Sequence, residues 1–126
     1  MMLTRKFAVI GLTLGLISCA ATVSVRADET PQIVKISASK YQFTPDHITL
    51  VKGEPVTLEL TSTDRTHGFM IRALKIDSTI EPGRTTSVTV TPDVVGNFKA
   101  ICDHYCGPGH GGMKMTVVVA EKTASR

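Results

Sequence analysis

Residues 102–113 concentrate the side chains of this chain that could bind a metal ion. The segment reads Cys-Asp-His-Tyr-Cys-Gly-Pro-Gly-His-Gly-Gly-Met and holds two of the three cysteines and two of the four histidines. Thiolate, imidazole and thioether groups together select soft or borderline metals, with copper ahead of zinc. Glycine adopts positive φ and permits sharp turns, and the segment has four: Gly107, Gly109, Gly111 and Gly112. These features predict a copper-binding loop.

A further strong ligand must come from elsewhere, and His67 is the candidate. It follows a polar loop after a predicted strand, and Gly68 lets the backbone come close to the metal loop. A lone histidine in such a place is more often a surface residue, so the cysteines are what favour a ligand here. His47 in a turn is predicted to be a surface residue. Met70 is predicted to be a core residue rather than a spare thioether ligand.

The first 27 residues have the pattern of an export signal. Arg5 and Lys6 precede an apolar run at 7–21 that is short for a membrane span, and residues 25–27 resemble a signal-peptidase site. The prediction is a signal peptide at 1–27 and a mature domain at 28–126, in the periplasm or on the outer face of a bacterial cell membrane. The alternatives are a lipoprotein signal, in which Cys19 would carry the lipid anchor, and an uncleaved anchor.

Net charge excludes one class of function. The predicted leader carries three of the 14 Lys and Arg residues and no acidic residue, which leaves 11 basic residues against 11 acidic ones. No basic cluster remains to bind a phosphate backbone, so nucleic-acid binding is not expected.

The mature chain has the pattern of an all-β domain. Strict alternation in 56–60 is typical of a half-buried strand, and no ten-residue stretch has a helical period. The segment 74–80 is ambiguous and is predicted to be a connection with some strand. Short strands between Gly and Pro turns predict a sandwich or barrel, with strands at 33–36, 41–43, 48–51, 56–60, 69–71, 85–91, 98–102 and 115–119.

The spacing Cys-x3-Cys-Gly-x2-His-x2-Met resembles the binuclear copper-A (CuA) loop of cytochrome c oxidase subunit II and nitrous-oxide reductase. The family's upstream His-Gly-Phe is matched at residues 67–69. The resemblance covers nearly the whole mature chain. It implies a cupredoxin fold, which is a Greek-key β-sandwich or barrel, and two copper ions per chain.

A ligand set follows from the chemistry of the donors and from this resemblance. Two thiolates, Cys102 and Cys106, would bridge the two coppers, and each copper would take one imidazole, from His67 or from His110. The weak ligands would be the thioether of Met113 and, as in the family, the backbone carbonyl between the cysteines, here that of His104. No coordination position would stay open, so the prediction is an electron carrier and not an enzyme.

The chain departs from the family in two respects. It has no tryptophan, although the oxidases use an exposed one to receive electrons from cytochrome c. Tyr105 could take that role, although a packing tyrosine is the simpler interpretation. His104 stands where the family commonly has an acidic residue, so its side chain is either a solvated loop histidine or an aid to copper capture.

Several alternatives stay open at this point. The expected partner is a c-type cytochrome or a terminal oxidase or reductase, but a copper carrier would instead serve a copper-accepting protein. A mononuclear blue-copper site would leave Cys102 idle, and zinc could occupy the same ligands. A structural disulfide between Cys102 and Cys106 would close too small a loop to stabilise the fold much, and would leave His110 and Met113 without a role.

Overall fold

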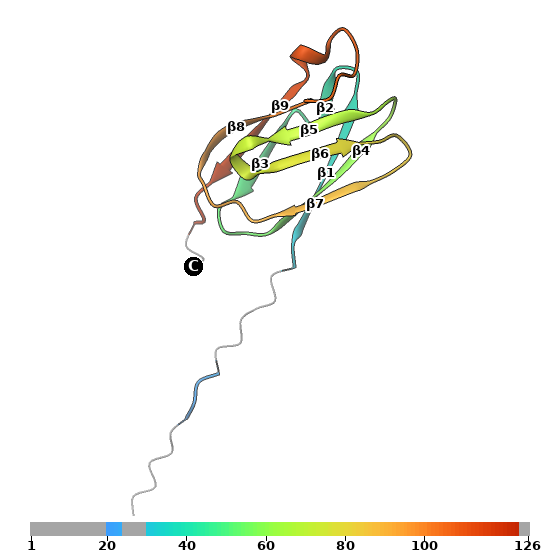
Figure 1. Cartoon of the computed structure of the whole chain (residues 1–126). Coiled ribbons are helices and arrows are strands. Elements are labelled where there is room, and N and C mark those ends of the chain that lie inside the picture. Colours follow the sequence, from blue (N-terminus) through green and yellow to red (C-terminus); the bar gives the residue numbers. More distant parts are fainter. Residues whose placement is uncertain (1–19, 24–29, 124–126) are drawn as a thin grey trace, which may run out of the picture.

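The computed structural model describes residues 20–23 and 30–123 (Figure 1). Residues 20–23 are exposed and irregular. The rest of the predicted signal peptide, with its cleavage site and the alternative lipid-anchor position Cys19, lies outside the described residues. Across the two described segments, no helix has the length and apolar character that a membrane crossing requires.

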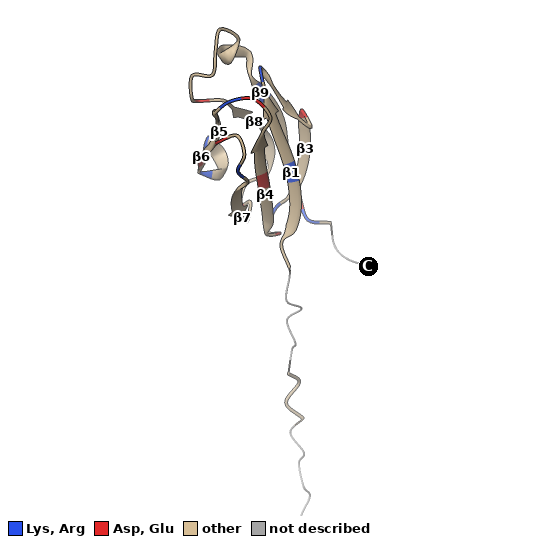
Figure 2. Ribbon diagram, turned by 90° about the vertical axis from the view of Figure 1, so that its right-hand side faces the viewer, with Lys and Arg blue, Asp and Glu red and all other residues tan. Residues whose placement is uncertain are grey.

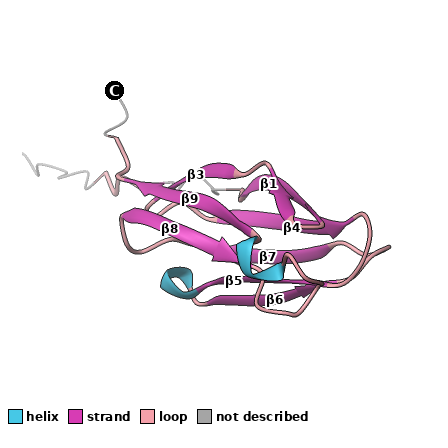
Figure 3. Cartoon of the chain, turned by 90° about the horizontal axis from the view of Figure 1, so that it is seen from above, coloured by secondary structure: helices cyan, strands magenta, loops and turns pink. Residues whose placement is uncertain are grey.

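Two β-sheets pack face to face, with the metal loop at one end (Figures 1 and 3). The first sheet has the order β2-β1-β4-β7 and the second the order β3-β9-β8-β5-β6. The pairs β1–β4 and β3–β9 are parallel, and the other pairs are antiparallel. The strands are β1 (Gln32–Ser39), β2 (Gln42–Thr44), β3 (His47–Val51), β4 (Val56–Ser62), β5 (His67–Ile71), β6 (Ile76–Ile80), β7 (Thr86–Val90), β8 (Gly96–Ile101) and β9 (Lys114–Ala120).

Alternating side chains from both sheets fill the core. In β4 and β9 every second residue is buried, because successive side chains of a strand point to opposite faces of its sheet. Phe43 and Phe69 meet edge to face between the sheets, with ring centroids 5.4 Å apart. The predicted all-β sandwich is confirmed.

The ambiguous segment 74–80 divides into two elements. A short 3-10 helix, η1 (Arg72–Leu74), follows β5, and the chain then turns through Lys75 at a positive φ of 56° into β6. Met70 is half-buried on the outer face of the second sheet, where it lines an apolar groove with Phe98 and Ile101. The prediction that Met70 is a core residue is therefore wrong, because the core-facing positions of β5 are His67, Phe69 and Ile71.

The metal loop, residues 102–113, connects β8 to β9. Its two ends meet where the backbone N–H of Cys102 donates to the carbonyl of Met113 at 3.1 Å. A short 3-10 helix, η2 (His110–Gly112), makes the last turn. Of the four loop glycines, Gly107 has a positive φ, at 132°, whereas Gly109, Gly111 and Gly112 do not. Gly111 and Gly112 lie in the helical turn, where ordinary negative φ serves.

Gly68 lets the metal loop lie directly on β5. The strand pairs with β8 at Met70 opposite Ile101, and beyond that point the loop covers its outer face. A Cβ added at Gly68 would lie 2.6 Å from the backbone nitrogen of His104 and would also overlap the Asp103 carboxylate. The position therefore tolerates no side chain.

Gly68→Ala is expected to destabilise the protein by about 1–3 kcal/mol, the usual cost of overpacking, because the loop backbone must move away. Urea unfolding of the metal-free protein measures this. The matched control is Gly111→Ala in the same loop, where an added Cβ meets open space. Equal midpoints for the two variants would show that the loop does not rest on β5 in this way.

Candidate metal centre

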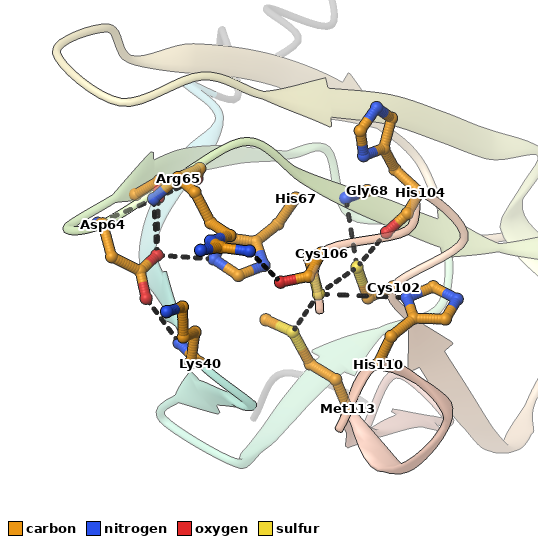
Figure 4. Close-up of polar contacts among 11 residues, drawn as sticks. Lys40, Asp64, Arg65, His67, Gly68, Cys102, His104, Cys106, His110 and Met113 are labelled. Atoms are coloured by element: carbon orange, nitrogen blue, oxygen red, sulfur yellow. Dashed lines mark hydrogen bonds and ion pairs between the residues drawn. The ribbon is translucent and has the colours of Figure 1, made fainter. Parts of the chain in front are cut away.

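The side chains of His67, Cys102 and Cys106 come together where the metal loop meets β5 (Figure 4). One ring nitrogen of the histidine and the two Sγ atoms all lie within 4.8 Å of one another. Among the described residues, this is the one group of three or more His, Cys, Asp and Glu side chains placed to share a metal ion. All three are buried, and His67 has no exposed surface. β5 supplies the histidine and the end of β8 supplies Cys102, so the second sheet brings together residues 35 and more positions apart.

The ring of His67 has one satisfied nitrogen and one free one. Its Nε2 lies 2.7 Å from Oδ1 of Asp64, whereas Nδ1 is buried and has no hydrogen-bond partner. A buried polar atom without a partner is costly, so a native one calls for an explanation. A metal ion on Nδ1 would provide it, since the neighbours of His67 at the site are two thiols.

The other predicted ligands surround the thiols. Nδ1 of His110 and Sδ of Met113 each lie 3.8 Å from Sγ of Cys106. The backbone carbonyl of His104 accepts a bond from Sγ of Cys102 at 3.1 Å, while the His104 side chain is exposed. The structure thus brings all six predicted groups to one place, with His104 present through its carbonyl.

Cys102 and Cys106 are free thiols whose Sγ atoms lie 3.5 Å apart. This separation is far beyond the length of an S–S bond, so the structure does not contain the alternative disulfide. Burial raises the pKa of Cys106 to about 11, and the neighbouring Cys102 adds to the rise while the Arg65 cation opposes it. The backbone N–H of Gly68 donates to Sγ of Cys102 at 3.3 Å, in the place of a sheet hydrogen bond.

The predictions for His47 and Tyr105 have different outcomes. His47 is exposed, as predicted, and its ring lies 3.5 Å from the Thr49 hydroxyl. The interpretation of Tyr105 as a packing residue is wrong, since the residue is 72% exposed. Its ring centroid lies 5.8 Å from that of His110, so the aromatic side chain connects a predicted ligand with the surface.

Sequence reasoning missed three residues that hold the ligands. Asp64 hydrogen-bonds His67, and Nη1 of Arg65 donates to the carbonyl of Cys106 at 2.9 Å. The ring of Tyr41, from the β1–β2 turn, lies against Gly107 and Gly109, where it fills the space of a Cβ. The position of Asp64 three residues before His67 was a usable signal. Nothing in the sequence pointed to Tyr41, which is 66 positions from the nearer glycine.

The pKa values of two acidic side chains near the site are shifted in opposite directions. Burial tends to raise the pKa of Asp64, but hydrogen bonds from His67 and from the backbone of Lys40 and Arg65 outweigh it and lower the pKa to about 2. Burial raises the pKa of Asp103, and the carboxylate of Asp77 nearby raises it further. Asp64 therefore keeps its negative charge at neutral pH, next to the predicted ligand His67.

The donor set fits copper. Two thiols, two imidazoles and a thioether are the ligands that copper prefers, and a zinc site would leave the weakly binding thioether unused. The cluster of His and Cys side chains can thus bind copper through chemistry and placement together. The ligand assignment residue by residue stays a prediction.

Comparison with known proteins agrees with this fold and site. A family model described as "Cupredoxin-like domain" matches residues 6–119. Cytochrome c oxidase subunit 2 of Thermus thermophilus is 31% identical over 101 residues, which are 80% of the chain and 75% of that protein. Nitrous-oxide reductase of Cupriavidus necator is 36% identical over 90 residues, which are 68% of the chain but only 14% of the reductase.

Among solved structures, the periplasmic domain of cytochrome oxidase subunit II from Bradyrhizobium japonicum has the same fold. The TM-score is 0.66 at 17% identity, over 76% of the chain and 86% of that domain. The resemblance found in the sequence is confirmed. The chain belongs to the cupredoxin-like domain family, as a relative of the CuA domains of cytochrome c oxidase subunit II and nitrous-oxide reductase.

Proposed function

We propose that this protein is an electron carrier with a binuclear copper centre. The observation that carries the proposal is the pair of buried free thiols, 3.5 Å apart, with an imidazole nitrogen of His67 or His110 beside them. Cys102 and Cys106 would bridge two copper ions, His67 and His110 would each hold one, and Met113 and the His104 carbonyl would be the weak ligands. Once bound, the copper pair would supply a one-electron redox couple.

Two coppers explain the donors better than one. A single blue-copper ion needs one thiolate, which would leave Cys102 buried and without a metal. Yet Sγ of Cys102 accepts the N–H of Gly68 at 3.3 Å and lies 3.5 Å from Sγ of Cys106. Both sulfur atoms thus lie together at the site, which supports a site that uses both.

The surroundings suit electron transfer more than chemistry on a substrate. His67, Cys102, Cys106 and Met113 are almost fully buried, so water has little access to the donors. Packing and hydrogen bonds fix these side chains, so they need not move when charge changes. No ligand position is left for a substrate, and the protein itself would not be an enzyme.

Electrons would pass through the exposed end of the metal loop. His110 is partly exposed, Tyr105 is largely exposed beside it, and residues 104–113 include no Lys, Arg, Asp or Glu (Figure 2). An uncharged surface of this kind suits a redox protein such as a c-type cytochrome or a terminal oxidase or reductase. With the predicted export signal, the protein would work in the periplasm or on the outer face of the membrane. The periplasmic domain of similar fold supports this location.

Copper delivery is a second candidate function. The observation that favours it is the exposed imidazole of His104, a residue whose backbone carbonyl lies 3.1 Å from Sγ of Cys102 and whose side chain could capture copper from solution. A carrier would give up its copper to a competing copper-accepting protein. An electron carrier would retain the metal through repeated cycles of reduction and oxidation.

The protein, with both thiols reduced before copper is added, is expected to bind two copper ions per chain. The electron paramagnetic resonance spectrum of this copper-loaded protein should be that of one unpaired electron shared by both ions. Cys106→Ser removes a bridge, and should abolish that spectrum and lower the metal content. Metal analysis and spectroscopy of the two proteins test this. Unchanged colour and copper content in the variant would refute the bridging assignment.

His110→Ala and His104→Ala form a matched pair within the loop. Losing the imidazole of His110 should weaken copper binding by more than about tenfold, since even the outer partners of metal ligands act on that scale. His104→Ala keeps its backbone carbonyl and should bind copper as the wild type does. Competition with a chromophoric copper chelator measures both, and a larger loss in His104→Ala would reverse the two roles.

Copper affinity is expected to rise with pH across the neutral range. The Cys106 thiol, with its pKa raised to about 11, holds its proton in the metal-free protein and must release it to bind copper. Each proton released strengthens binding by up to about tenfold per pH unit below that pKa. A pH indicator in weakly buffered solution records the release, and binding without proton release would show that Cys106 is not a ligand.

A further inference from the structure

Asp64 stands at the centre of the contacts that hold the candidate metal site. We propose that it is a positioning residue, whose carboxylate fixes the ring of His67 so that Nδ1, and not Nε2, faces the two thiols. This inference rests on the proposed copper function, and it adds a residue that binds no copper itself (Figure 4).

The carboxylate determines which nitrogen of His67 carries the proton. Both side-chain oxygens of Asp64 accept backbone N–H groups, Oδ1 from Arg65 and Oδ2 from Lys40, so the carboxylate is an acceptor at both atoms. The ring nitrogen 2.7 Å from Oδ1 is Nε2, and it must therefore be the donor. A neutral imidazole has one N–H, which leaves Nδ1 with a lone pair. That atom is the buried one without a partner.

Backbone groups from two loops hold the carboxylate in place. Oδ1 also accepts the N–H of Arg65 at 2.7 Å, and Oδ2 accepts the N–H of Lys40 at 2.7 Å. The N–H of Thr63 further ties this loop to the carbonyl of Ala38 at 3.1 Å. Because both oxygens are fixed, the carboxylate cannot rotate away, and the orientation of His67 is fixed with it.

The same contacts reach the cysteine side of the site. Tyr41 follows Lys40 in the β1–β2 turn and packs on Gly107 and Gly109 of the metal loop. Arg65 follows Asp64 and bonds the carbonyl of Cys106. Asp64 thus connects the position of the histidine ligand with the position of the thiol loop, although it is a loop residue whose side chain is 29% exposed.

A plain surface ion pair would look different. Surface ion pairs join two exposed side chains that are free to move, and they contribute little to the stability of the fold. Here His67 is wholly buried and its free nitrogen points to the thiols. A carboxylate behind a metal-binding histidine is a known way to fix the tautomer and raise the basicity of the ligand.

The experiment compares Asp64→Ala and Asp64→Asn with Asp93→Ala, which removes an exposed aspartate from the loop at the other end of β8. The first measurement is on the metal-free protein, where a two-bond proton–nitrogen correlation spectrum shows the tautomer of His67. The second is copper affinity by chelator competition. Thermal unfolding reports whether each variant is folded.

We expect Asp64→Ala to lose the single Nε2–H tautomer and to bind copper about 10–100-fold more weakly, the usual range for such outer partners. Asp64→Asn keeps an acceptor for Nε2–H, so it should keep the tautomer and lose less affinity. Asp93→Ala should match the wild type in both measurements.

A folded Asp64→Ala variant with the wild-type tautomer and the copper affinity of Asp93→Ala would overturn the proposal. If that variant fails to fold, Asp64→Asn decides, because loss of the single Nε2–H tautomer together with wild-type copper affinity would equally show that fixing this ring does not matter for binding. If the wild type binds no copper, the proposed function fails, while the tautomer measurement still tests the role of Asp64.

Discussion

The close approach of the metal loop to β5 is the constraint on which the site depends. The loop backbone at Asp103 and His104 lies against the face of Gly68 where a side chain would otherwise stand. This contact places Sγ of Cys102 on the N–H of Gly68, one residue from His67. The histidine and the thiols can share a space only because two backbones meet there without a side chain between them.

The metal-free site is built at a cost in stability. Nδ1 of His67 is buried without a partner, and an unsatisfied group of this kind costs about 1–3 kcal/mol. Both thiols are buried as well, and burial raises the pKa of Cys106, which disfavours the thiolate that a metal requires. Copper on these atoms would satisfy the nitrogen and stabilise the thiolates. The metal-free fold therefore carries a free-energy cost that metal binding would remove, as expected for a preformed site.

Two connections between strands, outside the metal loop, hold the candidate ligands in place. The β4–β5 loop supplies Asp64 and Arg65, and the β1–β2 turn supplies Tyr41. These segments bond to one another through Lys40 and Asp64. A loop rich in glycine gains its order from such contacts, because its own backbone has much conformational freedom to lose.

The sequence by itself determined the type of fold and predicted the metal loop and its donor atoms, because strand alternation and ligand spacing are local patterns. It placed Cys102, Cys106, His110 and Met113 within one short segment, and it made His67 a candidate ligand through its position after a strand and before Gly68, which the family's His-Gly-Phe then supported. It could not determine that Asp64 orients His67, that Tyr41 packs on the loop, that Met70 faces outward or that Tyr105 is exposed. Those facts depend on which segments become neighbours when the two sheets pack, and contacts between distant segments leave no periodic pattern in a single chain.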